Sequence, residues 1–246
     1  MAATKLNADN LTLITYQRSV ICQGMERQLS TVSAGPTRKR RGEGHTRRDE
    51  ILIAAKELFL REGYQATTIR RIAEVVGVSA PALYLYFKDK DAILIALCDQ
   101  TFASLIELMD GLDQQALTPL ERLRSCGAAY IRFALEHPRE YWLTFMSGNT
   151  PVEIKKRGHK PETFDPDEPG SKGAVAFARL MGTFRDIENS GFQLNYPVET
   201  AAELVWMSLH GLVAALINNP EFPWTKRDLL IDGMLDLAVR GVVKVP

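Results

Sequence analysis

The sequence predicts an all-α protein, with an N-terminal three-helix helix-turn-helix domain, a larger helical-bundle domain and about nine helices in total. Three observations predict this class. Apolar residues recur at the 3.6-residue spacing of helices along most of the chain. No segment reads convincingly as a strand. The 30 basic and 30 acidic residues are unevenly divided: residues 38–90 hold 12 basic and 7 acidic side chains, and residues 91–246 hold 15 and 21. That division indicates a basic module for a polyanion, followed by an acidic module with a different role.

The composition argues against several classes of protein. No window holds about 18 consecutive apolar residues, so we expect no membrane span and a cytoplasmic location. The three cysteines (Cys22, Cys98 and Cys126) have no short spacing between any two, which argues against a disulfide framework or a metal clamp. We find no nucleophile with a neighbouring base and no glycine-rich phosphate loop. We therefore expect no enzymatic activity, no cofactor and no metal.

Residues 1–45 predict a flexible basic tail. They are rich in Ser, Thr, Gln and Gly, lack a sustained helical period and end in the basic run at 38–41. A solvated arm is the interpretation we favour. The alternative is an arm that reaches phosphates or a minor groove, as such extensions do in other DNA binders. A separate hypothesis is that translation begins at Met25.

Residues 46–92 predict three short helices that form the first domain. The first helix carries one apolar stripe, made of Ile51, Leu52, Ala55, Leu58 and Phe59. Gly63 stops it, and Thr67 or Thr68 caps the second helix, which ends at Gly77. Ser79 caps the third helix, which holds Pro81 in its first turn and buries Leu83 and Phe87.

The segment Val76–Ser79 joins two short helices and predicts a helix-turn-helix. The tight turn needs the backbone freedom of Gly77. A three-helix core with a purely structural role is the alternative. Confinement of the positive charge to this domain, the tyrosines of the third helix, and Arg70 and Arg71 at the start of the second favour DNA binding.

Residues 93–246 predict the second domain. A helix over 90–109 leads into it, and its further expected helices cover 119–136, 138–146, 171–189, 198–218 and 226–243. The proline-containing segment 148–170 is unusually long for a loop, and we favour disorder over a mobile lid. The last two helices are apolar on more than one face, which indicates burial on two sides.

Large side chains scattered over several of these helices predict a ligand pocket. The candidates are Phe102, Tyr130, Phe133, Trp142, Phe145, Met146, Phe177, Trp206 and His210. Simple packing of the core is the alternative for each of them. His210 in particular has the surroundings of a core histidine.

Specific motifs resemble one known family. Residues 46–94 resemble the DNA-binding domain of the TetR/AcrR family of bacterial transcriptional regulators. The matching pattern is Ile51-x-x-Ala54-Ala55-x-x-Leu58-Phe59, Gly63-Tyr64-x-x-Thr67-Thr68-x-x-x-Ile72-Ala73 and Gly77-Val78-Ser79-x-x-x-Leu83-Tyr84-x-Tyr86-Phe87-x-x-Lys90-x-x-Ile93-Leu94. A weaker resemblance links the second domain to the regulatory domain of the Trp-His-Gly (WHG) subgroup, through Tyr130-Ile131-Arg132-Phe133-Ala134-x-x-His137-Pro138 and Trp206-x-x-x-His210-Gly211.

The resemblance implies that the third helix, from Ser79 to Phe87, lies in the major groove of double-stranded DNA. It places the base-reading side chains at Arg70, Ala80, Pro81, Ala82, Tyr84 and Leu85, and the phosphate contacts at Thr68, Tyr86 and Lys90. This chain departs from many relatives in one respect, because Ala80, Ala82 and Leu85 offer no hydrogen bond. Thymine methyls and DNA shape would then carry more of the recognition. Arg70 would be the main hydrogen-bonding discriminator.

The family resemblance also implies a repressor released by an unknown small molecule, apolar or amphipathic, bound in the second domain. It further implies a homodimer through the last two helices, which presents two reading heads to a palindromic operator. A purely intramolecular role for those helices is the alternative. The competing function is an architectural or partner-recruiting DNA-binding protein with no inducer.

Overall fold

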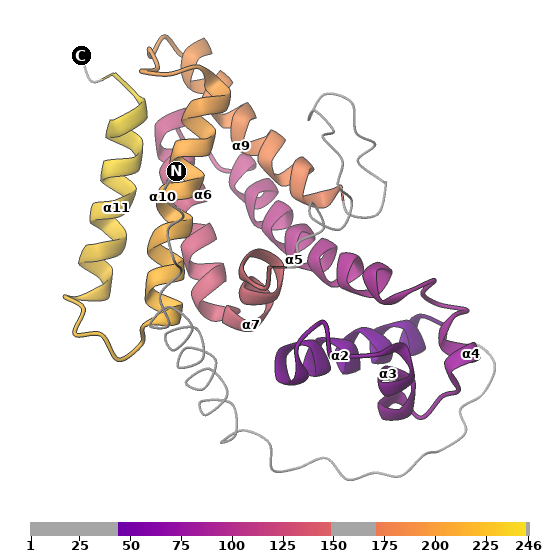
Figure 1. Ribbon diagram of the computed structural model, residues 1–246. Helices are drawn as coiled ribbons and strands as arrows, with labels where there is room; N and C mark the ends of the chain where they lie inside the picture. The colour runs from indigo at the N-terminus through magenta and orange to yellow at the C-terminus, as the bar shows by residue number, and fades with distance from the viewer. Residues whose placement is uncertain (1–43, 149–170, 245–246) are drawn as a thin grey trace, which may run out of the picture. The chain divides into compact units, whose positions relative to one another are not determined.

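The computed structural model describes residues 44–148 and 171–244 (Figure 1). This part of the chain contains nine α-helices and one π-helical turn, and its only β pairing is an isolated bridge between Leu194 and Val243. The helices are α2 (Gly44–Glu62), α3 (Ile69–Val76), α4 (Ala80–Leu83), α5 (Lys90–Asp113), α6 (Pro119–Glu136), α7 (Pro138–Tyr141), η2 (Trp142–Met146), α9 (Lys172–Asn189), α10 (Val198–Asn218) and α11 (Arg227–Val242). The predicted all-α class is confirmed. The predicted tail up to residue 43, the start-site hypothesis and most of the predicted 148–170 loop lie outside the described residues.

The apolar stripe of α2 builds the first of two cores, which we call the N-terminal core. Its buried members are Ile51, Leu52, Ala55, Leu58, Phe59, Ile72, Ala73, Leu83, Phe87, Ile93, Leu94, Leu97, Cys98 and Leu143. All five residues of the predicted stripe are among them. Full burial of a side chain such as Phe59 stabilises the fold by about 1.5–3 kcal/mol. The core therefore holds α2, α3 and α4 against the start of α5.

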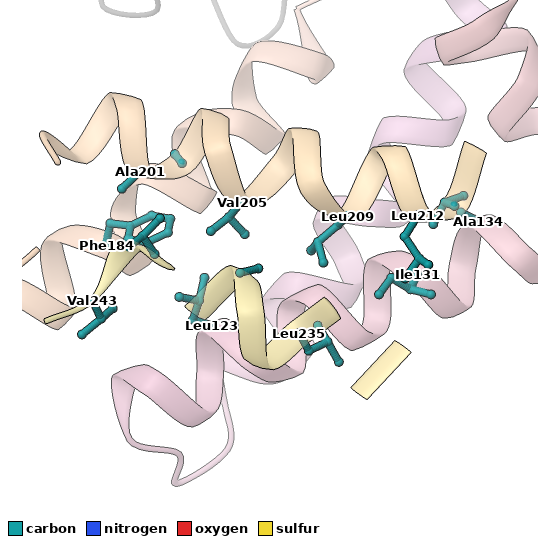
Figure 2. Close-up of a cluster of buried hydrophobic side chains, with 14 of the residues drawn as sticks. Leu123, Ile131, Ala134, Phe184, Ala201, Val205, Leu209, Leu212, Leu235 and Val243 are labelled. Carbon is teal, nitrogen blue, oxygen red and sulfur yellow. The ribbon is translucent and has the colours of Figure 1, made fainter. Parts of the chain in front are cut away.

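The second core, the C-terminal core, joins α6, α7, α9, α10 and α11. Figure 2 shows Leu123 and Ile131 of α6 facing Val205 and Leu209 of α10, with Leu235 of α11 beside them. The α10 and α11 helices lie side by side (Figure 1). This core holds the helices of the larger domain together.

A single helix, α5, takes part in both regions. Its first turns bury Ile93 and Leu94 in the N-terminal core. Farther along, Leu105 is buried against the larger domain, where α5 packs on α6 and α9. The two regions are therefore joined by uninterrupted helix.

Side-chain caps begin the short helices where the sequence predicts them. The hydroxyl of Thr68 accepts a hydrogen bond from the backbone N–H of Arg71 at 3.1 Å, and that of Ser79 accepts one from Ala82 at 3.2 Å. Gly77 ends α3 in the left-handed conformation, with φ of 74°. The N–H of Val78 then reaches the carbonyl of Ala73 at 2.9 Å, as in a Schellman turn.

Three helix boundaries differ from the prediction by two residues or more. The third helix, expected to run as far as Phe87, ends at Leu83, because the next backbone N–H groups bond three residues back, from Leu85 to Ala82 and from Tyr86 to Leu83. This tighter winding replaces regular helix with turns. The α2 helix begins at Gly44, inside the predicted tail, and α5 continues to Asp113.

Two helices, α5 and α10, are long and apolar enough to cross a membrane by length and composition alone. The sequence criterion of an unbroken apolar run did not detect them. Both pack against neighbouring helices in the structure. Core helices satisfy the same criterion, so this property is weak evidence for a membrane span.

The left-handed turn after α3 leads to a stability prediction. Gly77→Ala should lower the free energy of unfolding by about 1–2 kcal/mol, because a Cβ disfavours positive φ. No atom lies within 4 Å of the added Cβ, so the effect would be conformational. Chemical denaturation measures it.

The matched control is Gly111→Ala in α5, where the added Cβ also meets nothing within 4 Å and φ is helical. It should raise stability by about 0.5–1 kcal/mol. Equal effects of the two substitutions would contradict the account.

Candidate nucleic-acid interface and ligand cavity

The turn between α2 and α3 is held by Lys90, the first residue of α5. Its ammonium group donates to the carbonyl oxygens of Tyr64 at 2.6 Å and Thr67 at 2.9 Å, and lies 4.2 Å from the centroid of the Tyr64 ring. Partial burial lowers the pKa of Lys90. These contacts engage its donors within the protein, so the geometry does not favour the phosphate contact expected of Lys90. The lysine instead positions the start of α3.

Three consecutive large side chains after α4 face solvent. The exposed fractions are 54% for Tyr84, 84% for Leu85 and 37% for Tyr86. Exposed large apolar side chains in a row are uncommon unless they meet a partner. Although α4 is shorter than predicted, the turns that follow it still present the expected reading residues.

The other residues predicted to contact DNA differ in their exposure to solvent. Pro81 is exposed, whereas Ala80 and Ala82 are half-buried, and Ala80 packs against the N-terminal core. Thr68 and Ser79 are exposed, but their hydroxyls already cap α3 and α4. Because these residues stand at the N-termini of α3 and α4, a phosphate would be bound there by the backbone N–H groups of the helix ends.

Two adjacent arginines on α3 differ in their surroundings. Arg71 pairs with Glu74 at 2.9 Å and with Glu62 at 3.6 Å, and its contact with Glu74 is the main cause of its raised pKa. Arg70 is exposed and forms no hydrogen bond or ion pair within the described residues. Its guanidinium group is therefore available for an external acceptor, which the predicted contact with a base would require.

A cavity of about 590 Å³ lies in the larger domain, among α5, α6, η2, α9 and α10. Six of the nine predicted pocket residues line it: Phe102, Tyr130, Phe145, Phe177, Trp206 and His210. Its volume falls in the range of small-molecule sites. The sequence therefore identified most of the aromatic wall.

The other three predicted pocket residues lie elsewhere. Phe133 is buried against the ring of His137, with the centroids 4.8 Å apart. Trp142 is half-buried outside the cavity lining. The sulfur of Met146 is 3.9 Å from the side-chain nitrogen of Asn218. Helical spacing alone could not show which side of α6 and η2 faces the cavity.

A tyrosine that the sequence analysis missed contacts two polar residues of the cavity wall from behind. Tyr141 is fully buried, and its hydroxyl contacts Nδ1 of His210 and, at 3.1 Å, the hydroxyl of Tyr130. Burial raises the pKa of Tyr130 to about 12 and raises that of Tyr141, whereas it lowers the pKa of His210. Burial therefore favours the neutral form of all three groups. The only sequence signal for Tyr141 was its i,i+4 spacing from Phe145.

The residues just before Tyr141 connect the larger domain to α2. Lys56 of α2 pairs with Glu140 at 2.8 Å, and Arg139 pairs with Glu57 of α2 at 2.5 Å. The Lys56–Glu140 pair lines a second cavity, of about 550 Å³, where α2, α5, α6 and α7 meet. Helix α7 therefore contacts the cavity wall through Tyr141 and forms ion pairs with α2 of the helix-turn-helix domain.

Comparison with protein families gives two matches. Residues 51–97 match the TetR family of bacterial regulatory proteins, and residues 123–241 match the tetracyclin repressor-like C-terminal domain. The HTH-type transcriptional repressor AcnR of Corynebacterium efficiens is 37% identical over 173 residues, which are 70% of this chain and 82% of that protein. Further curated regulators match over 24% to 48% of their own length. The narrower Trp-His-Gly subgroup stays a prediction.

Solved structures show the same fold. A TetR-family transcription regulator from Shewanella sp. PV-4 has a TM-score of 0.64 at 15% identity, covering 81% of this chain and 99% of that one. The fatty acid degradation regulator FadR from Bacillus halodurans has a TM-score of 0.63 at 17% identity, covering 83% and 98%. At these identities the likeness concerns the fold alone.

The contrast between the two arginines gives a prediction. Arg70→Ala should weaken binding to a specific duplex by about 1–3 kcal/mol and relax the preference at one base pair. Binding to operator and scrambled duplexes at fixed salt measures it.

Arg71→Ala is the neighbouring control, since Arg71 is already engaged by Glu62 and Glu74. It should leave the preference between duplexes intact. Full retention of that preference by Arg70→Ala would refute the assignment.

Proposed function

This chain belongs to the TetR family of bacterial regulatory proteins, and we propose that it is a cytoplasmic homodimeric repressor released from a palindromic operator by a small molecule. The family's members are DNA-binding regulators of transcription and not enzymes. The name of AcnR describes a repressor, which supports that sign of regulation here. The observation that carries the proposal is the exposed surface formed by Arg70 and residues 84–86.

The DNA-binding step follows from that surface. The α4 helix and its following turns would enter the major groove, where Tyr84 and Leu85 meet base edges and thymine methyls. Arg70 would supply a bidentate hydrogen bond to guanine. Tyr86 and the N-termini of α3 and α4 would hold phosphates, which fix the register without reading sequence.

A second copy of the chain is the proposed partner of α10 and α11. These helices expose large apolar side chains, namely Met207 at 52%, Leu229 at 65% and Leu237 at 70%. Burial of this face in a two-fold interface would remove it from water. The dimer would place its two reading heads about 34–36 Å apart, one turn of DNA.

Release by a ligand requires that the cavity and the DNA-binding surface influence each other. Two routes support this: α5 contributes to both regions, and α7 joins the Tyr141 network to α2 through Arg139 and Glu140. A molecule that displaces Tyr141 or His210 would shift α7 and with it α2. Such coupling is reciprocal, so operator DNA would weaken ligand binding by the same factor.

The experiment that tests the function is footprinting of the protein on the DNA upstream of its own gene, against excess random competitor. The proposal predicts protection of a palindrome. Diffuse, salt-sensitive retardation would indicate binding to phosphates alone and would favour an architectural role. The half-buried Ala80 and Ala82, which offer no side-chain hydrogen bond, are the observation behind that second candidate.

The dimer proposal gives a further prediction. Leu237→Lys should raise the dissociation constant of the dimer at least about tenfold, because a charge would replace apolar area buried in the interface. Analytical ultracentrifugation across a concentration series measures the change, and operator affinity should fall with it.

Ile53→Lys is the control, since Ile53 is also a largely exposed aliphatic residue, at 61%, but lies on α2. It should leave the dimer intact. If the dissociation constant of the dimer is unchanged in Leu237→Lys, this face of α11 is not part of the interface.

A further inference from the structure

The charged side chains that line the 590 Å³ cavity are all acidic within the described residues. They are Asp99 of α5 and Glu203 of α10, and no Lys or Arg of the described ranges joins them. A carboxylate brought into this cavity would lose its hydration without gaining a cation. The exposed carboxylate of Glu203 would also repel it. An anionic ligand is therefore disfavoured by charge.

Each carboxylate lies one helical turn from an aromatic ring on the same helix. Asp99 is three residues before Phe102, and Glu203 is three residues before Trp206, so each pair shares a helix face. The Trp206 ring contacts Phe177 of α9, with the centroids 6.5 Å apart. Aromatic faces attract cations, and quaternary ammonium groups are recognised in this way.

Glu203 and Trp206 lie where the cavity is accessible to solvent. Trp206 is 37% exposed, and Glu203 is exposed and has no hydrogen bond or ion pair among the described residues. A cationic group held there would pair with the carboxylate without being fully dehydrated. The apolar part of the molecule would extend inward along Phe102 and Leu105.

Neutral polar groups lie beside the Trp206 ring, whose centroid is 5.6 Å from that of the His210 ring. Tyr130 and His210 line the cavity, and each contacts the hydroxyl of Tyr141 behind them. Neutral hydroxyl and imidazole groups accept or donate a single hydrogen bond but supply no counter-charge for an anion. Tyr130 and His210 therefore add no counter-charge for a carboxylate.

From this arrangement we propose that the cavity binds an amphipathic organic cation, with its positive group between Glu203 and the Trp206 and Phe177 rings. The proposal deepens the proposed function and rests on it, because it names the class of the releasing molecule. The apolar tail of the ligand fills the inner cavity, and its entry disturbs the Tyr130–Tyr141–His210 contacts.

The test compares three probes that share one tail: decyltrimethylammonium, decanol and decanoate. Isothermal titration calorimetry on the full chain, below the micellar concentration, measures each affinity. The ammonium probe should bind at least about tenfold more tightly than decanoate, with decanol between them. Equal binding of all three, a preference for decanoate, or no binding would each overturn the proposal.

A pair of glutamine variants tests the position of the charge. Glu203→Gln should lower the affinity for decyltrimethylammonium about threefold or more and leave decanol unaffected. Glu199→Gln, one turn earlier on α10 and outside the cavity lining, is the matched control and should change neither. Both residues are exposed, so neither variant threatens folding. Identical behaviour of the two variants would refute the role of Glu203.

Operator binding measured beside calorimetry separates this proposal from the proposed function. If decyltrimethylammonium binds tightly but does not release DNA, the cavity does bind an amphipathic cation, but the proposal of a repressor released by its ligand is contradicted. Release of DNA by decanoate alone would retain ligand-controlled repression and overturn the cationic class.

Discussion

The arrangement of the protein depends on one constraint, which is that α5 packs in two places as a continuous helix. Its N-terminal turns are fixed by Ile93 and Leu94 in the N-terminal core, and its later turns contribute Phe102 and Leu105 to the cavity wall. A helix of 24 residues cannot move at one end without moving or straining the other. Helix α5 therefore contributes side chains both to the cavity wall and to the core that holds α2, α3 and α4.

Helix α7 provides a second connection between the two regions. Tyr141 belongs to the C-terminal core, and the two residues before it form ion pairs with Lys56 and Glu57 of α2. Partly buried ion pairs fix orientation more than they add stability, because desolvation offsets much of the attraction. Together α5 and α7 hold the helix-turn-helix domain at two points, so a ligand that shifts one relative to the other would change its orientation.

Local features of the fold could be predicted from the sequence because their causes are local. The caps at Thr68 and Ser79, the left-handed Gly77 and the apolar stripe of α2 all depend on residues within a few positions of one another. Contacts across the fold could not be predicted in this way. Tyr141 is buried beside His210, which lies 69 positions later in the chain. Lys90 holds the α2–α3 turn through Tyr64, which lies 26 positions earlier. The periodicity of apolar residues gives no information about contacts at such separations.

The central claim is that DNA binding and the cavity are coupled through α5 and α7, and hydrogen–deuterium exchange tests it most directly. Exchange would be compared with and without the palindromic operator, with no ligand present. The account predicts altered protection in residues 138–146, which lie outside the helix-turn-helix domain, as well as in residues 79–90. Changes confined to residues 46–92 would contradict the coupling, because the cavity wall would then be indifferent to DNA.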